Sequence, residues 1–365
     1  MRVLVVTVVH TPLDARIHHR QIGAMVQAGW SVTYAAPWSA TGTSPAAARP
    51  GVVTHDLPRA VGRRRLPALR AARRLIAEQA PHHDLVVVHD PELLLALGRP
   101  ARRPPVVFDV HEDLAASLVD RPWIPRALRG LAARGARLLE RHAERRLHLL
   151  LAEEAYAGRF RRPHPVVRNL PSLPPDPPPP GRDRVVYVGR LSRGRGVEEL
   201  VELARRLGPA GPRVELVGQP DGDVRAELEA ASSDGTLVWH GWLPNEEALD
   251  LLGGALAGLS LLRDLPNYRI SLPTKVVEYL AAGLPVVTTP LPAAVDLVRE
   301  ADAGIVVGFG DVTAAADAVR RLRDDPQRAA AMGRRGRELI ARDWTWDTER
   351  EVFLDALTSA ARSAA

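Results

Sequence analysis

The sequence predicts an α/β protein with two doubly wound parallel-sheet domains, and two observations support this fold class. Runs of β-branched residues alternate with helical stretches up to residue 170, and the same alternation starts again at residue 184. A segment rich in proline, residues 171–180, separates the two series. The chain of 365 residues is also long enough for two domains of ordinary size.

The N-terminal half opens with residues 2–9, a run of mostly valine and leucine that is typical of a strand buried on both faces. We expect a helix over residues 17–27, ended by Gly29, and a second strand over residues 31–35. Together they form one β-α-β unit. The further strands expected in this half cover residues 52–55, 85–89, 105–110, 147–152 and 165–167.

The proline-rich segment can be neither a helix nor a central strand, because so many of its residues lack an amide donor. The strands expected after it cover residues 184–188, 214–217, 237–240, 257–261, 286–288 and 305–307. The predicted organisation is an N-terminal domain over residues 1–170, a linker over 171–183, a C-terminal domain over 184–344 and a final helical segment, 345–365, which we expect to pack back on the N-terminal domain. Open α/β sheets bind ligands at the carboxyl ends of their strands, so the default site is a cleft between the domains.

Composition excludes several classes of site and leaves others open. The chain has no cysteine, which rules out disulfides, cysteine-ligated zinc and cysteine nucleophiles. Its 49 basic residues include a single lysine, Lys275, and this bias, with abundant alanine and proline, resembles a GC-rich bacterial genome. The net charge of +6 allows nucleic acid, an anionic membrane or a phosphorylated substrate as partner. An aromatic content of 4% and the lack of a binding module argue against nucleic acid.

Neither a cleavable leader nor an apolar run of roughly 20 residues is found in the sequence, so we expect a cytoplasmic protein. Leucine and arginine interleave over residues 121–146, and a basic run occupies residues 63–65. Such amphipathic helices with a cationic face suit peripheral contact with an anionic membrane at the inner face of the cell. The alternative is a solvated face enriched in arginine by codon usage.

The first strand-to-helix turn of the second half is the sharpest local signal. It contains Gly189, Arg190, Gly194, Arg195 and Gly196, directly before a predicted helix. Glycines allow a close backbone approach, the helix start presents free amides, and the arginines add full charges, so this turn suits a diphosphate. It matches neither the Gly-x-Gly-x-x-Gly nor the P-loop pattern. The alternative is a tight turn in an arginine-rich chain.

A second signal joins a loop, a helix and a strand over residues 267–288. Lys275 and Glu278 are three residues apart near the start of the predicted helix, so both can lie on one face. There the ammonium can meet a phosphate and the carboxylate can bind a sugar diol. The alternative is a surface ion pair. Asp221 and Asp223 imitate an Asp-x-Asp metal motif, but their place after a strand and a turn indicates a solvated turn.

These motifs resemble those of the retaining glycosyltransferases of family 4, the group 1 glycosyl transferases. Residues 189–191 with 195–196 resemble the family's Gly-Arg-Leu…Lys-Gly phosphate motif, with Arg195 in the lysine place. Residues 214–218 and 241–244 resemble its next strand and the turn near the donor base. Residues 273–287 resemble the subtype pattern Pro-x-Lys-x-x-Glu-Tyr-x-Ala-Ala-Gly-x-Pro-Val-Val. In the first half, residues 14–16, 85–91 and 108–112 resemble the subtype's opening loop, its mid-domain strand and turn, and its Asp-x-His-Glu motif.

The resemblance implies the GT-B architecture, in which two Rossmann-like domains face each other across a cleft. It also implies a hexosyltransferase of the EC 2.4 class, acting in glycan or glycoconjugate biosynthesis, which moves a sugar from a nucleotide-sugar donor with retention of configuration and needs no metal or cofactor. The acceptor stays open between a glycan, a lipid carrier and a small metabolite. A sugar-nucleotide epimerase or hydrolase of the same shape is the alternative function.

The resemblance assigns roles to individual residues. Arg190 and Arg195 would hold the diphosphate, Glu278 the ribose hydroxyls, and His111 the transferred sugar. The further donor-binding residues implied are Gly189, Gly194, Gly196, Leu243, Pro244, Ser271, Leu272, Pro273 and Lys275. The residues implied on the acceptor or sugar side are Asp14, Arg16, His89, Asp109 and Glu112. No metal ligand is expected.

Two features depart from the family pattern. The family's usual pair of glutamates is seven residues apart, and Ile270 stands where the first would be. Backbone amides around residues 271–273, or Lys275, would have to replace its contact with the donor sugar. In addition, residues 10–14 replace the glycine-rich opening loop of many members, so the sequence gives no acceptor-binding motif there.

Overall fold

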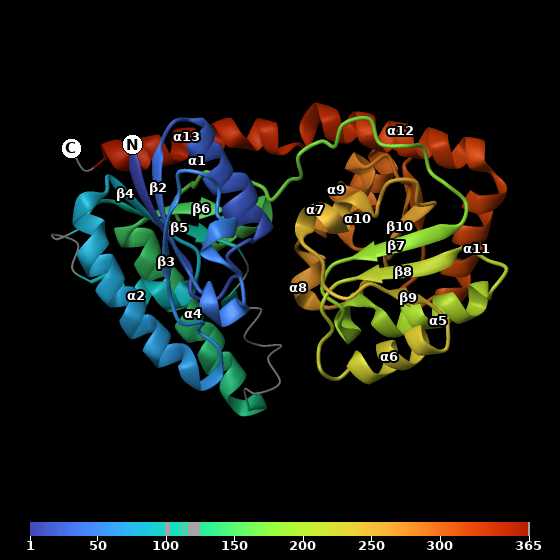
Figure 1. The fold of residues 1–365 in the computed structure, drawn as a ribbon, viewed down its shortest axis with the longest axis horizontal. Helices are drawn as coiled ribbons and strands as arrows, with labels where there is room; N and C mark the ends of the chain where they lie inside the picture. Colours follow the sequence, from blue (N-terminus) through green and yellow to red (C-terminus); the bar gives the residue numbers. More distant parts are fainter. Residues whose placement is uncertain (99–102, 112–113, 116–124, 364–365) are drawn as a thin grey trace. The chain divides into compact units, whose positions relative to one another are not determined.

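The computed structural model describes residues 1–98, 103–111, 114–115 and 125–363, which form two compact units (Figure 1). The N-terminal unit consists of Met1–Asn169 together with Asp347–Ala365, and the C-terminal unit of Leu170–Trp346. Each unit contains a six-stranded parallel sheet with helices on both faces, so the predicted fold class is confirmed.

The sheet of the N-terminal unit has the strand order β3-β2-β1-β4-β5-β6. Its strands are β1 (Arg2–Val6), β2 (Ser31–Ala36), β3 (Val53–Asp56), β4 (Leu85–Val88), β5 (Val106–Val110) and β6 (His148–Leu151). Its helices are η1 (Ala15–Ile22), α1 (Gly23–Gln27), η2 (Ser39–Thr41), η3 (Pro45–Ala47), η4 (Gly62–Arg64), α2 (Arg65–Gln79), η5 (Ala80–His82), η6 (Pro91–Leu95), α4 (Arg126–Arg146), η8 (Glu154–Arg159) and α13 (Trp346–Arg362). The order reverses between β1 and β4, the point at which doubly wound sheets place their sites.

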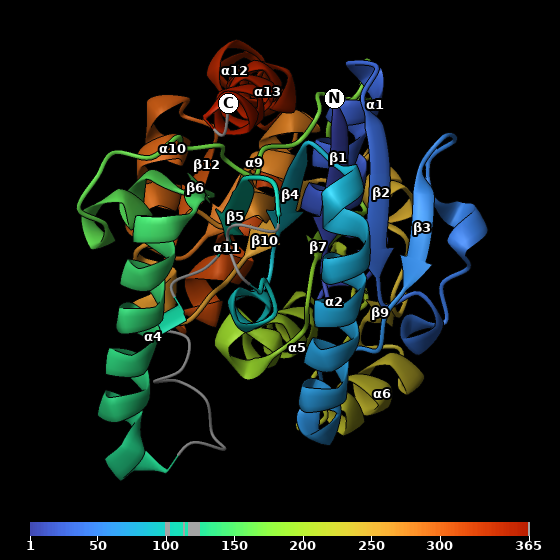
Figure 2. The same ribbon diagram turned by 90° about the vertical axis from the view of Figure 1, so that its left-hand side faces the viewer.

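The two faces of this sheet are covered by different helices (Figure 2). On one face, α2 and α4 bury small and branched side chains such as Ala72, Ile76 and Ala143 against Val86 and Phe108. On the other face lie η1, α1 and α13, and their buried side chains include Ile22 and Phe353. Valine-rich strands form here because both faces are removed from water.

Three predictions for the N-terminal unit need correction. β1 ends at Val6 and does not extend to residue 9, because the amides of Val8 and Val9 turn to the Asp90 carboxylate. The helix starts at Ala15, earlier than predicted, and its first eight residues form a π-helix. Residues 165–167 form no strand; a single bridge joins Val166 to Leu151.

The sheet of the C-terminal unit has the order β12-β11-β10-β7-β8-β9. Its strands are β7 (Arg184–Val188), β8 (Arg213–Val217), β9 (Val238–Trp239), β10 (Ala257–Ser260), β11 (Val286–Thr288) and β12 (Gly304–Val306). Its helices are η9 (Arg193–Arg195), α5 (Val197–Leu207), α6 (Arg225–Ser233), α7 (Asn245–Asp250), α8 (Pro266–Arg269), α9 (Thr274–Ala281), α10 (Pro292–Glu300), α11 (Val312–Asp324) and α12 (Pro326–Asp343). The order reverses between β7 and β10, and both strands are central.

Two hydrophobic clusters sandwich this second sheet. One packs α5, α6 and α11 against side chains such as Tyr187 and Leu216, and the other packs α7, α9 and α10 against side chains such as Val186 and Val286. The Tyr279 ring of α9 fills the space where a side chain on Gly258 would stand, since a Cβ there would lie 2.1 Å from the ring. This close contact fixes α9 on β10 and so places Lys275 and Glu278 relative to the sheet.

The segment expected as a linker lies against the C-terminal unit. The Gly181 amide donates to the Ala255 carbonyl, and the Arg337 guanidinium donates to the Pro174 carbonyl. The final helix α13 belongs to the N-terminal unit, where Glu349 accepts hydrogen bonds from the backbone and side chain of Arg168.

Candidate functional site

The turn after β7 lies at the carboxyl end of the sheet of the C-terminal unit. The Gly189 amide donates to the Val217 carbonyl, and the Gly218 amide donates to the Gly241 carbonyl. These bonds hold the turns after β7, β8 and β9 beside one another. Gly189 and Gly218 both have a positive φ, and a Cβ on Gly218 would lie 1.9 Å from the Gly189 carbonyl oxygen. Glycine is therefore required at Gly218 for the turns to meet.

The other two glycines of this turn are also set by packing. A Cβ on Gly196 would lie 2.0 Å from the Leu261 carbonyl oxygen, and one on Gly194 would lie 2.9 Å from the Leu265 side chain. Gly196 has a φ of +82° and starts α5. The turn therefore packs tightly on the loop that follows β10, which accounts for Gly194 and Gly196 without a ligand.

Lys275 is buried at the centre of this region. Its side chain projects from the first turn of α9, is 4% exposed, and places Nζ 3.5 Å from the centre of the Tyr187 ring. A Cβ on Gly189 would lie 3.4 Å from Nζ, so the lysine reaches the turn after β7. The alternative of a surface ion pair with Glu278 is therefore wrong for Lys275.

The charge of Lys275 is poorly compensated among the described residues. Nζ has no hydrogen-bond partner there. Burial lowers the pKa of the Lys275 ammonium well below its usual range, the nearby Arg195 guanidinium lowers it further, and Glu278 opposes both. Arg195 also acts on Tyr187, where it opposes the rise in the pKa of the phenol that burial causes, and the Tyr187 hydroxyl donates to the Arg190 carbonyl at 2.7 Å. Lysine, arginine and glutamate thus converge at one edge of the sheet.

The other arginines near the turn form ion pairs with carboxylates. Arg190, whose side chain is 66% exposed, donates from Nε to Asp221 at 2.7 Å. Arg193 pairs with Asp223 and Glu198, and Arg263 pairs with Glu198 and Glu199; the last two carboxylates lie in the first turn of α5. Asp221 and Asp223 therefore lie in a turn, as predicted, but their carboxylates pair with arginines and are not merely solvated.

The other residues predicted to bind the donor lie at helix starts of the same unit. Ser271, Leu272 and Pro273 directly precede α9, where the Ser271 hydroxyl donates to the Asn267 carbonyl. Leu243 and Pro244 directly precede α7. All the residues predicted to bind the donor thus lie in the C-terminal unit.

Ile270, which stands where the family pattern has a glutamate, lies directly before Ser271. Ile270 is 41% exposed, which is high for an isoleucine and makes it one of the exposed large hydrophobic residues of the described chain. Glu278 is half-buried on α9.

In the N-terminal unit, a buried ion pair connects η1 to β5. The Arg16 guanidinium donates to both oxygens of Asp109, at 2.9 and 2.7 Å, and to the Val167 carbonyl at 2.8 Å. Gln21 donates to the same carboxylate at 2.6 Å. Arg16 is 3% and Asp109 1% exposed. Burial alone raises the pKa of the Asp109 carboxyl, but Arg16 and His111 outweigh it and hold the pKa well below the usual range.

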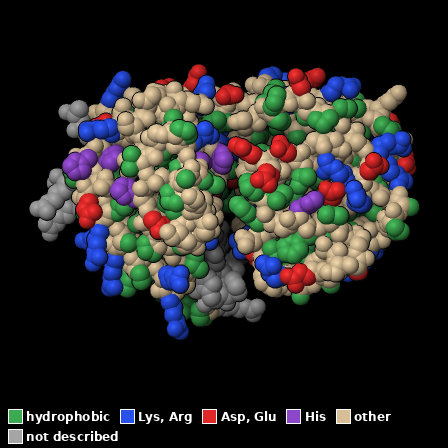
Figure 3. Space-filling view, viewed as in Figure 1, with side chains coloured by type: hydrophobic (Ala, Val, Ile, Leu, Met, Phe, Trp, Pro, Cys, Tyr) green, Lys and Arg blue, Asp and Glu red, His purple; other side chains and the backbone are tan. Residues whose placement is uncertain are grey.

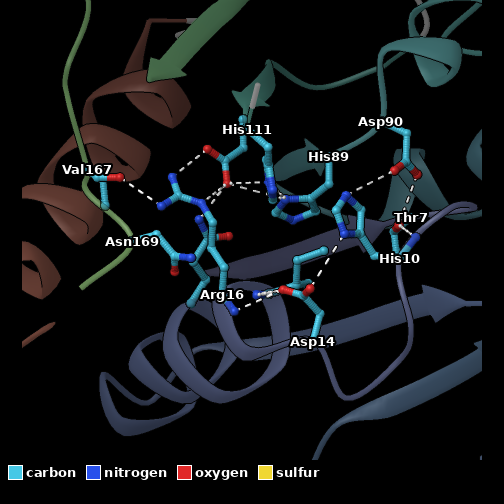
Figure 4. A network of polar contacts seen from close by, with 12 residues as sticks. Thr7, His10, Asp14, Arg16, His89, Asp90, His111, Val167 and Asn169 are labelled. Atoms are coloured by element: carbon cyan, nitrogen blue, oxygen red, sulfur yellow. Dashed lines mark hydrogen bonds and ion pairs between the residues drawn. The ribbon is translucent and has the colours of Figure 1, made fainter. Parts of the chain in front are cut away.

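Two histidines complete this cluster (Figure 4). Nε2 of His111 lies 3.0 Å from Asp109 Oδ2 and 3.0 Å from Nδ1 of His89, which is itself buried. We assign the proton of His111 to Nε2, because the ionised Asp109 oxygen can only accept. Burial lowers the pKa of His111 to about 4, although Asp109 acts in the opposite direction. His111 is therefore a neutral imidazole near pH 7 with a lone pair on Nδ1.

His10 and Asp90 belong to the same network and were not among the predicted site residues. Asp90 Oδ2 accepts from the Thr7 hydroxyl at 2.9 Å and from the Val8 amide at 2.5 Å. The His10 ring lies 3.5 Å from carboxylate oxygens of both Asp14 and Asp90, and its centre lies 5.0 Å from that of His111. The sequence pattern could have indicated this contact, because Thr7 and Asp90 follow two strands that lie side by side in the sheet and whose carboxyl ends share one edge.

The grouping of His89, Asp109 and His111 also has the composition of a metal site, with ligand atoms within 4.8 Å of one another. Its charge environment disfavours a cation, since Arg16 already donates to both oxygens of Asp109. A divalent ion bound to that carboxylate would stand beside a fixed guanidinium. We therefore interpret the cluster as a hydrogen-bonded support for His111.

The predicted acceptor-side residues separate into two groups by burial. Arg16, His89 and Asp109 are buried beneath His111, while His111 and Asp14 remain partly exposed. Asp14 also accepts from the amides of Arg16 and Ile17 and so caps η1. Glu112 lies outside the described residues.

Comparison with known proteins relates the chain to glycosyltransferases. Residues 182–325 match the model of the family described as glycosyl transferases group 1. The chain is 30% identical over 168 residues to the 2-deoxystreptamine glucosyltransferase of Streptomyces kanamyceticus, covering 45% of this chain and 42% of that protein. It is 26% identical over 190 residues to the D-inositol 3-phosphate glycosyltransferase of an Arthrobacter strain, covering 50% and 44%. The chain thus spans less than half the length of these curated relatives.

Similarity to solved structures extends over the whole chain. Sucrose-phosphate synthase of Thermosynechococcus elongatus superposes with a TM-score of 0.75 at 18% identity, covering 100% of both chains. HepE of Anabaena, solved with UDP and glucose, gives a TM-score of 0.71 at 16% identity over 98% of this chain and all of the other. At these identities the likeness shows the fold. The chain therefore has the GT-B fold throughout, and its residues 182–325 are similar in sequence to group 1 glycosyl transferases.

Proposed function

We propose that the chain is a hexosyltransferase that moves a sugar from a nucleotide-sugar donor to an acceptor, with retention of configuration and without a metal ion. The observation that carries this proposal is the convergence of Lys275, Arg195 and Glu278 at the turn after β7, within the segment similar to group 1 glycosyl transferases. The solved HepE complexes with UDP and UDP-glucose support a nucleoside diphosphate as the group recognised.

The chemistry explains why cations are needed on the donor side. Transfer breaks the bond between the anomeric carbon and a phosphate oxygen, and the nucleoside diphosphate leaves with that electron pair. The anomeric carbon forms a new bond to the acceptor oxygen, and the acceptor hydroxyl gives its proton to a phosphate oxygen of the leaving diphosphate. Charge growing on the diphosphate is stabilised by preorganised cations. We assign this role to Arg190 and Arg195, and the ribose hydroxyls to Glu278.

On the sugar side, we propose that His111 accepts a hydrogen bond from a hydroxyl of the transferred sugar through Nδ1. The Nε2 proton is held by Asp109, and Asp109 is in turn fixed by Arg16 and Gln21. His89, Asp109 and Arg16 then act as positioning residues, because burial keeps them from substrate. We propose that the acceptor binds to the exposed part of this unit, which includes Asp14.

Replacing His111 by alanine should lower kcat more than it raises the donor Kd, since the contact is made with the reacting sugar. Wild-type activity should also fall as the pH drops through about 4, where protonation of His111 removes the lone pair on Nδ1. Steady-state kinetics and imidazole NMR titration of His111 measure both effects. A change in donor Kd alone would show that His111 contributes to binding of the donor and not to the transition state.

A labelled nucleotide-sugar assay tests the proposal as a whole. The expected result is label transferred to an acceptor, at the same rate with and without EDTA. Turnover of donor without acceptor would identify the alternative, a sugar-nucleotide epimerase or hydrolase, and a loss of activity in EDTA would contradict metal independence. A thermal-shift screen of UDP, GDP, ADP and dTDP identifies the nucleotide, because a ligand at 100 times its Kd stabilises by about 2.7 kcal/mol.

A further inference from the structure

We infer that α4 is a docking surface for the face of a bilayer that contains anionic lipids. The inference does not depend on the proposed function, since it is based on the exposed side of one helix. Within the described part of the chain we find no helix with the length and apolar character of a membrane span. Contact would therefore be peripheral, with the helix lying in the plane of the lipid headgroups.

The first observation is a stripe of exposed leucines. Leu128, Leu131 and Leu138 have exposed fractions of 51%, 68% and 62%. Their spacings of three and seven residues place them on one side of the helix, along roughly 15 Å of its length. Exposed leucines scattered singly need no explanation, but an aligned row marks an interaction surface.

The second observation is the charge that flanks this stripe. Arginines lie between and after these leucines along the helix, and no carboxylate of the described residues forms an ion pair with them. They are Arg134, Arg137, Arg141, Arg145 and Arg146, and all are exposed. On a helical projection, the first four lie to one side of the leucine row. The exposed face of α4 is thus apolar along one line and cationic beside it.

The carboxylates of α4 are turned away from this face. Glu140 is buried and pairs with Arg159, and Glu144 is buried and accepts from the amides of Arg161 and Arg162. Glu154, in the neighbouring helix η8, is an exposed carboxylate. On α4 itself, the charged side chains that are exposed among the described residues are all arginines.

The exposed leucines and arginines of α4 together favour one kind of partner. Anionic lipids supply negative charge to the arginines and an apolar layer to the leucines, and both are needed here. A nucleic acid would satisfy the arginines and leave the leucines in contact with charged backbone. A second copy of the chain would bring two rows of arginine together. In Figure 2, α4 runs along the outside of the N-terminal unit, beside the β5–β6 end of the sheet.

Further arginines are exposed on α2 of the same unit. They include Arg70, Arg73 and Arg74, and basic side chains gather over this helix in Figure 3. α2 and α4 cover the same face of the sheet. Positive charge therefore continues beyond α4, which favours attraction to an anionic layer over a longer range than the helix alone would give.

The test is sedimentation of the full chain with vesicles of phosphatidylcholine, alone or with about 30% phosphatidylglycerol, at roughly physiological ionic strength. We expect binding to the anionic vesicles only. The double variant Leu131→Glu, Leu138→Glu should lower the partition coefficient at least tenfold. The triple variant Arg134→Gln, Arg137→Gln, Arg141→Gln should lower it by about a hundredfold, since each basic residue near the surface contributes a fewfold factor.

Matched controls keep the test specific to α4. Val352→Glu changes an exposed apolar residue on α13, and a triple glutamine variant at Arg321, Arg328 and Arg334 removes the same charge from exposed positions on α11 and α12. Both controls should bind like the wild type, and circular dichroism should show all variants folded. The inference is overturned by equal binding to neutral vesicles, by unchanged binding of the α4 variants, or by a dimer that the leucine variant dissociates.

Discussion

Replacing Arg16 by methionine is expected to lower the free energy of unfolding by about 3–5 kcal/mol, because it leaves the Asp109 carboxylate buried and unpaired. Arg16 gives that carboxylate two hydrogen bonds, and both residues are almost completely buried. Urea-induced unfolding at pH 7 measures the effect. The double variant Arg16→Met, Asp109→Asn should recover part of the loss, since it removes the uncompensated charge.

The exposed pair of Arg2 and Asp84 serves as the control. Its side chains are 60% and 40% exposed, so Arg2→Met should cost less than about 1 kcal/mol. The loss of folding stability at acidic pH provides a second measurement. The pKa of Asp109 is depressed in the folded state, so its contribution is present above its unfolded pKa of about 4 and is lost as the pH falls through the lower folded value. Arg16→Met should flatten this acid dependence; a loss no larger than that of Arg2→Met would contradict the structural role.

Glu278→Ala and Arg190→Ala should each abolish measurable transfer while leaving the fold intact. Removing Arg190 takes a preorganised positive charge away from the diphosphate, which typically costs roughly 100-fold to 1,000-fold in kcat. Removing Glu278 takes away the proposed contact with the ribose hydroxyls that holds the donor. Arg190 is largely exposed and Glu278 half-buried, so neither supports the core. Labelled-donor kinetics measure the loss of activity, and urea unfolding measures stability.

Exposed ion-pair residues on the same unit provide controls for these variants. Arg205→Ala on α5 and Glu229→Ala on α6 each remove one charge from an exposed pair. Both should retain wild-type activity. Wild-type turnover in Glu278→Ala or Arg190→Ala would withdraw the residue concerned from the donor site, and activity lost equally in the controls would indicate a general effect of charge.

The fold was predictable where the chain repeats one local pattern. Valine-rich runs followed by helices predict parallel strands, and the strands of both sheets were found within a few residues of the expected positions. The errors lie where a distant partner decides the backbone. β1 stops at Val6 because Asp90, 84 residues further on, captures the next amides. No pattern within a window of adjacent residues contains that information.

The candidate site was predictable only as far as its motifs are local. The turn from Gly189 to Gly196 and the pair Lys275 and Glu278 are short patterns, and the structure brings them together. The stacking of Lys275 on Tyr187 was not predictable, because it depends on how far α9 sits from β7. The support of His111 is also non-local, since Arg16 reaches Asp109 across 93 positions of the chain.

The N-terminal unit includes the final helix, so the two units are completed in a different order from the one in which they start along the chain. Residues 170–346 are continuous, so the C-terminal unit can fold as soon as its last strand and helices leave the ribosome. The N-terminal unit precedes it in the chain but is incomplete without α13, because the buried Phe353 and Leu357 and the partner of Arg168, Glu349, all belong to this last helix. The N-terminal unit therefore receives its last helix only after the whole C-terminal unit has been synthesised, and until then the apolar surface that Phe353 and Leu357 pack against lacks this cover.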